Sequence, residues 1–160
     1  MAMHKMSPKH ILAASLICLS AVAPAGLAQS GTLDSEAKNY KLSMEKIKAY
    51  DSATVKMKAV LASDPALQSS MMEALKKGDM MTALENNPKL RAVIKASGIS
   101  AQEFLLIPSC VQITASVYNS QAQGSAMGAA VSQENIAFYV KNKAEIDQIV
   151  KNWQTKPAGK

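Results

Sequence analysis

The chain has 160 residues, 18 basic and 12 acidic side chains, and a formal net charge of +6. This length is enough for one domain with its own core. Both histidines, His4 and His10, lie in the first 28 residues. The rest of the chain therefore lacks the imidazole that Ser-His-Asp and Cys-His nucleophiles and His-ligated metals require.

Residues 1–28 have the pattern of a secretory signal peptide. Lys5 and Lys9 form a positive segment, and the apolar run Ile11–Ala23 follows it. Small residues then lead to an expected cleavage site before Gln29. The run is shorter than the about 20 apolar residues that a membrane-spanning helix needs. We therefore predict export to the periplasm, or secretion, with no membrane span after cleavage.

Two details of this leader have alternatives. Cleavage after Ala28 is preferred, but cleavage after Ala23 or Ala25 also fits the small-residue pattern. Lipidation of Cys18 is disfavoured, because the large side chain of Ile17 precedes it. The expected organisation is a signal peptide at 1–28 and one helical domain at 29–160, with an ordered core of about 34–153.

The exported part has a modest positive charge. Without Lys5 and Lys9, 16 basic and 12 acidic residues remain, which gives +4. Arg91 is the one arginine, and the lysines are scattered apart from Lys76–Lys77. Nucleic-acid binders usually cluster their basic residues among arginines or aromatics. A solvated surface without a nucleic-acid partner is therefore expected.

The first helical pattern runs from Asp34 to about Ala62. Its apolar side chains recur on one side at about 100° per residue. These residues are Tyr40, Met44, Ile47, Tyr50, Met57 and Leu61. Asp51 and Lys58 are expected at the margin of this stripe.

Short helices with clear end signals follow. Asp, Asn and Ser cap helix starts, proline suits the first turn, and glycine suits the left-handed residue at the end. The expected caps are Asp64, Asp79 and Asn87, the first-turn prolines are Pro65 and Pro88, and the terminal glycines are Gly78 and Gly98.

The stretch "GISAQEF" predicts a joint between two helices. Ser100 and Glu103 form the spacing of a capping box, and Ile99 and Phe104 that of a hydrophobic staple. A catalytic Ser100 or Glu103 would need a neighbouring base or second carboxylate, and the sequence shows neither. We therefore interpret this stretch as structural.

The next helix, from Ala101 to about Gln123, is the most apolar and is expected at the centre, around Phe104–Tyr118. Pro108 inside it predicts a kink. A strand over part of the run is the weaker alternative, because Val111, Ile113, Thr114 and Val117 favour strands.

A glycine-containing connection at 119–130 leads to the last helix. Ser132 is its expected cap, with Val131 and Ile136 at staple positions. The expected apolar face consists of Ile136, Tyr139, Val140, Ile146, Val150 and Trp153. Residues 155–160 are expected to be a disordered tail.

Two kinds of side chain suggest chemistry. Met71, Met72, Met80 and Met81, with Cys110, could bind soft Cu(I), although their helical spacing favours core positions. Acidic residues such as Glu145 and Asp147 show no paired motif. A histidine-independent hydrolase is a further alternative only because carboxylates distant in sequence can converge in a fold. We assign no catalytic, cofactor-binding or metal residue. After cleavage of the signal peptide Cys110 is the only cysteine left, so no internal disulfide is expected.

Three segments resemble a type of small secreted helical protein of Gram-negative bacteria. They are "DPAL" at Asp64–Leu67, "GISAQEFLL" at Gly98–Leu106 and "SQENIAFYVKNKAEI" at Ser132–Ile146. The resemblance implies an all-helical periplasmic domain and provides no catalytic or binding residues.

Together these patterns predict an all-α, compact bundle of five to six helices. The expected function is non-enzymatic binding, without a cofactor. The partner is an unknown protein or a small apolar ligand. In the ligand version, Phe104, Ile107 and Val111 would line an apolar cleft beside Pro108.

Overall fold

A computed structural model describes residues 36–37, 39–122 and 131–154. This part of the chain contains six helices and no strand, which confirms the all-α fold. The helices are α2 (Met44–Ser63), α3 (Pro65–Lys77), α4 (Met80–Asn86), α5 (Pro88–Lys95), α6 (Ala101–Ala122) and α7 (Gln133–Gln154). The signal peptide, Gly124 and Gly128 of the predicted connection, and the predicted tail lie outside the described residues.

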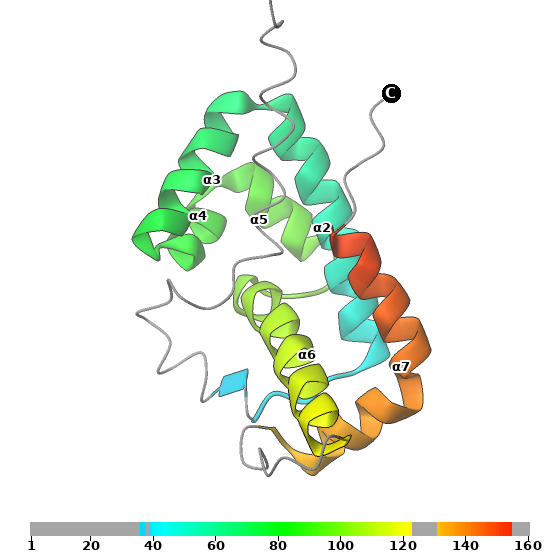
Figure 1. Cartoon of the computed structure of the whole chain (residues 1–160). Coiled ribbons are helices and arrows are strands. Elements are labelled where there is room, and N and C mark those ends of the chain that lie inside the picture. Colours follow the sequence, from blue (N-terminus) through cyan, green and yellow to red (C-terminus); the bar gives the residue numbers. More distant parts are fainter. Residues whose placement is uncertain (1–35, 38, 123–130, 155–160) are drawn as a thin grey trace, which may run out of the picture.

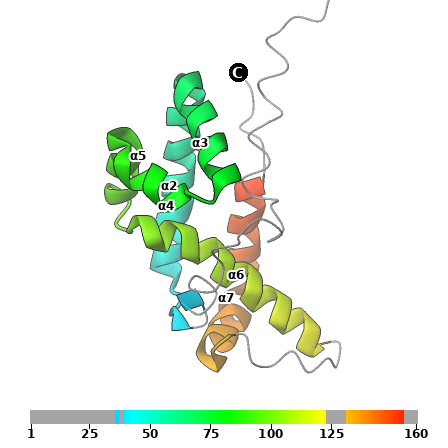
Figure 2. The same ribbon diagram turned by 90° about the vertical axis from the view of Figure 1, so that its left-hand side faces the viewer.

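The long helix α2 extends through both halves of the molecule. The short helices α3, α4 and α5 gather beside its C-terminal half, and α7 lies along its other half (Figure 1). A quarter turn of the molecule again shows α2 and α7 side by side (Figure 2). Helices α2 and α6 each pack against four other helices. The centre predicted for α6 alone is therefore shared by α2 and α6.

The predicted continuous helix over 34–62 is wrong at residues 40–43, although residues 36–37 and 39 before them are helical. Residues 40–43 are not helical, and α2 begins at Met44. The side chain of Asn135, on α7, accepts a hydrogen bond from the Leu42 N–H (3.0 Å) and donates one to the Tyr40 carbonyl (2.7 Å). Ser43 then caps α2 by accepting from the Lys46 N–H. These contacts replace the helical hydrogen bonds that the periodicity predicted.

The end signals of the short helices are largely confirmed. Asp64 caps α3 through the Leu67 N–H at 3.1 Å, and Asn87 caps α5 through two backbone N–H groups. Gly78 ends α3 with a φ of 78°. Asp79 stands at the cap position of α4, but its side chain makes no capping hydrogen bond. The last residue of α5 is Lys95, three positions before Gly98.

The joint before α6 is a capping box, as predicted. The Ser100 N–H donates to Glu103 Oε2 at 2.9 Å, and the Glu103 N–H donates to Ser100 Oγ at 3.0 Å. The helix then continues through Pro108 to Ala122, so the strand alternative is wrong. The kink at this proline stays a prediction.

The last helix follows its predicted cap, and its predicted apolar face is buried at Ile136, Tyr139, Ile146 and Trp153 but not at Val140. Ser132 Oγ accepts from the Asn135 N–H at 3.2 Å. Val140, expected on the apolar face, is 49% exposed, whereas Ile149 is buried. Trp153 is buried as expected, and its ring meets the Tyr50 ring edge-on at 4.7 Å between centroids. The buried face therefore follows Tyr139, Ile146, Ile149 and Trp153.

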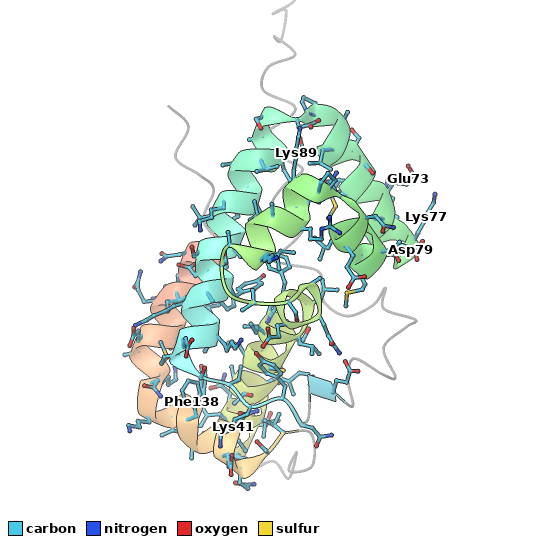
Figure 3. The ribbon with its side chains drawn as sticks, turned by 180° about the vertical axis from the view of Figure 1, so that it is seen from behind. Lys41, Glu73, Lys77, Asp79, Lys89 and Phe138 are labelled. Carbon is cyan, nitrogen blue, oxygen red and sulfur yellow. The ribbon has the colours of Figure 1, made fainter. Side chains whose placement is uncertain are left out.

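Charged side chains form six ion pairs within the described residues. Figure 3 shows Glu73 and Lys77 on the outer side of α3, where their charged atoms are 2.7 Å apart. Exposed pairs of this kind contribute little to stability, because water and salt screen their charges. Within these described ranges, no helix is both long and apolar enough to cross a membrane.

Candidate functional site

A group of polar contacts surrounds the Glu103 carboxylate at the start of α6. Besides the Ser100 N–H, it accepts a hydrogen bond from the Tyr40 hydroxyl at 3.3 Å and pairs with Lys46 Nζ at 2.9 Å. Lys46 Nζ also donates to the Gly98 carbonyl at 3.4 Å. This Glu103 cluster therefore joins the segment before α2, α2 itself and the turn that precedes α6.

These contacts determine the protonation states of the Glu103 carboxyl and the Tyr40 hydroxyl. Partial burial alone would raise the pKa of Glu103, but the Ser100 N–H and Lys46 outweigh it and hold that pKa below its usual range. Burial, followed by the nearby negative charge of Glu103, raises the pKa of Tyr40. At neutral pH the pair is thus a carboxylate and a neutral phenol, which is the combination that the hydrogen bond needs.

The cluster borders a cleft of about 360 Å³ that is also lined by Glu36 and Gln102. Two carboxylates in one cleft is the arrangement that the hydrolase alternative requires. However, Glu36 accepts a hydrogen bond from Gln102 at 2.8 Å, and Glu103 is held by three donors. A general acid needs a raised pKa near the working pH, and the pKa of Glu103 is lowered. The geometry therefore favours a structural role.

A second cleft, of about 450 Å³, lies where α4 and α5 meet the start of α6. We call it the Arg91 cleft. Its lining comprises Glu85 and Asn86 of α4, Arg91, Ile94 and Lys95 of α5, and Ile99, Ser100 and Ala101 of the joint. Ile94 and Ile99 belong to the core and are buried, while the polar side chains are exposed. The cleft thus combines an apolar floor with a polar rim.

The charged side chains on this rim form no ion pair with other residues that the structure describes. None of the six ion pairs within the described residues includes Arg91, Lys95 or Glu85. Arg91 and Lys95 are four residues apart on α5, so they share one side of that helix. The rim therefore presents two cations and one carboxylate to solvent.

The methionines suggested for Cu(I) occupy two environments. Met71 and Met80 are buried members of the hydrophobic core, whereas Met72 and Met81 are half-buried. Their packing is the gap-filling role that helical spacing favours. Cu(I) binding stays a hypothesis.

Cys110 is buried beneath the segment that precedes α2. Its Sγ donates to the Ala37 carbonyl at 3.4 Å. Burial raises the pKa of this thiol to about 11, so little thiolate exists at neutral pH. Cys110 is therefore a buried thiol.

The apolar cleft expected beside Pro108 does not match the observed clefts. Phe104, Ile107 and Val111 are 5%, 0% and 3% exposed and belong to the hydrophobic core. They line neither of the two clefts above. Their side chains pack against other helices, because α6 is covered by α2, α4, α5 and α7. The geometry thus gives no support to the apolar-ligand version.

The acidic residues noted in α7 serve separate contacts. Glu145 pairs with Lys48 of α2 at 2.7 Å. Asp147 pairs with Lys143 and accepts a hydrogen bond from the Tyr139 hydroxyl at 2.9 Å. Because they point to different partners, they do not form a two-carboxylate site.

Sequence reasoning missed the Arg91 cleft and the roles of Tyr40 and Lys46. The available signal was Arg91, the single arginine among 18 basic residues. Comparison with protein-family models, with curated proteins and with solved structures found no match to this chain. The resemblance to small secreted helical proteins therefore stays an expectation.

Proposed function

We propose that this protein is an exported, periplasmic binding protein without enzymatic activity, and that it holds a protein or peptide partner in the Arg91 cleft. The proposal rests on one observation: the cleft has an apolar floor, and its two cations have no ion-pair partner in the described part of the fold. Its volume of about 450 Å³ lies within the usual range of ligand sites.

The side chains that could serve as a nucleophile or a general acid support the proposal that the protein is not an enzyme. Glu103 is held ionised by three donors, and Cys110 is buried and protonated. Neither is available as a nucleophile or general acid without breaking contacts that position helices. By contrast, Arg91 and Lys95 are exposed and bind nothing within the described residues.

Photo-crosslinking in the producing cells tests the binding function. A photoreactive residue replaces Lys95 at the cleft, and the same residue replaces Lys141, an exposed lysine of α7, as the matched control. We expect a discrete cross-linked product from position 95 and none from position 141. Equal products from both positions, or none from position 95, would contradict the proposal.

Export is tested separately. The signal-peptide pattern at 1–28 predicts that the periplasmic fraction contains a chain beginning at Gln29. The intact mass of the protein from that fraction measures the cleavage site. A full-length chain confined to the cytoplasm would overturn the export part of the proposal.

A further inference from the structure

From the Arg91 cleft we infer the class of its ligand: a peptide whose free C-terminal carboxylate meets Arg91 and Lys95 and whose last side chain is apolar. This inference rests on the proposed binding function and goes beyond it, because it names the group that is recognised.

The cations determine which end of a peptide fits. Arg91 and Lys95 lie one helical turn apart on α5, and both are exposed at the rim. Guanidinium groups bind carboxylates through two parallel hydrogen bonds, which gives direction as well as attraction. A terminal carboxylate is the negative group that every peptide carries, and capture of this terminus is a recurring mode of recognition.

The remaining lining favours a peptide over a simple fatty or inorganic anion. Ile94 and Ile99 form an apolar floor that a final aliphatic or aromatic side chain can cover. Glu85 and Asn86 supply carboxylate and amide oxygens at the same cleft. Such acceptors match peptide N–H groups, and a simple fatty or inorganic anion has no N–H groups to offer them.

The capping box holds in place the joint before α6, which lines the cleft together with α4 and α5. Ser100 is held by reciprocal hydrogen bonds with Glu103, and Glu103 is in turn held by Lys46. Ile99 and Ala101 on either side are therefore positioned before any ligand arrives. Because this wall is already ordered, less conformational entropy is lost when a ligand binds.

The experiment is an NMR titration of the exported chain with acetyl-Gly-Ser-Ala-X peptides, where X is alanine, valine, leucine or phenylalanine. Each peptide is used with a free carboxylate and in amidated form. We expect the backbone amide signals of Ile99, Ser100 and Ala101 to shift with a free-acid peptide at a Kd of about 1 mM or tighter. Amidation should weaken binding about tenfold or more, because it removes a charge-assisted contact.

Two variants locate the contact. Arg91→Gln should weaken the free-acid peptide about tenfold while leaving the affinity of the amidated peptide nearly unchanged. Lys141→Gln, which removes an exposed lysine of α7, should change neither affinity. Thermal unfolding of both variants checks that the fold is intact, and substitutions at exposed positions of this kind usually change stability little.

The remaining outcomes overturn the inference in distinguishable ways. Equal affinity for acid and amide, or no shift with any of the peptides, removes the terminal carboxylate as the recognised group. Equivalent binding of butyrate or inorganic phosphate would show general anion binding. If cross-linking from position 95 still succeeds in those cases, the binding function stands and only the ligand class falls.

Discussion

Glu103 connects three segments through one carboxylate, and this makes it sensitive to substitution. Glu103→Gln removes the charge that holds Lys46 and weakens the capping box with Ser100. We expect a loss of about 1–3 kcal/mol in the free energy of unfolding at pH 7, since both a cap and a charge-assisted contact are affected. Urea unfolding measures it. Glu85→Gln, at an exposed position with no ion pair among the described residues, is the control and should cost less than about 0.5 kcal/mol.

The same residue predicts a pH dependence with a definite sign. The folded pKa of Glu103 is lowered from its ordinary value of 4.5. Its stabilisation is therefore fully present above pH 4.5 and is lost as the pH falls through the lower folded pKa. The difference in stability between the wild type and Glu103→Gln should shrink between neutral pH and pH 3. A difference that stays constant over this range would refute the assignment.

Asn135 is nearly fully buried, and its amide joins α7 to the chain before α2. Asn135→Ala would leave the buried Leu42 N–H and the partly buried Tyr40 carbonyl without their partner. We expect a loss of about 2–4 kcal/mol, because each unsatisfied buried group costs about 1–3 kcal/mol. Hydrogen exchange of the Leu42 amide should also accelerate. Asn142→Ala, which removes a bond within α7 to Phe138, is the milder control.

At the scale of the element, Gly98 shows why a turn residue matters. Its φ is 77°, and a Cβ added there would meet nothing within 4 Å. Gly98→Ala therefore tests backbone strain without a steric clash. We expect a loss of about 1–2 kcal/mol from the left-handed conformation, and a smaller loss for Gly98→Asn. Thermal denaturation measures both, and equal stability of all three proteins would contradict the strain argument.

Helix starts were predictable where the signal lies within a few residues. Asp64, Asn87, Ser100 and Ser132 each cap a helix through a neighbouring backbone N–H, so the sequence alone contains the whole motif. The start of α2 also has a local cap, because Ser43 accepts from the Lys46 N–H, but the apolar periodicity over 34–62 concealed it. The non-helical chain before this cap is held by Asn135, which is 93 positions from Leu42, and no local pattern records such a contact.

The candidate site was only partly predictable for a related reason. The capping box that forms one wall of the Arg91 cleft was evident from "GISAQEF". The cleft itself arises because α4 and α5 fold back toward that joint, which periodicity does not reveal. The exposure of Val140 and the burial of Ile149 were likewise not evident from the periodicity of α7.

At the scale of the whole molecule, α2 joins two groups of helices. One group is α3, α4 and α5, and the other is α6 and α7. Ile47 and Leu61 are both core residues of this helix, although they lie near opposite ends of it. Helices α3 and α5 pack on α2, and so do α6 and α7. Neither group can lose its structure without exposing part of α2 to water. The two groups should therefore unfold together rather than as separate units.

Two probes can test this cooperativity in urea. Trp153 fluorescence reports on the contact of α7 with Tyr50 of α2, while far-UV circular dichroism reports on all helices, including α3, α4 and α5. We expect coincident transitions with an m-value of about 1–3 kcal/mol/M. Asn135→Ala should move both midpoints to lower urea by the same amount. A loss of ellipticity that precedes the fluorescence change would show that α3–α5 unfold first, and that α2 does not couple the two groups.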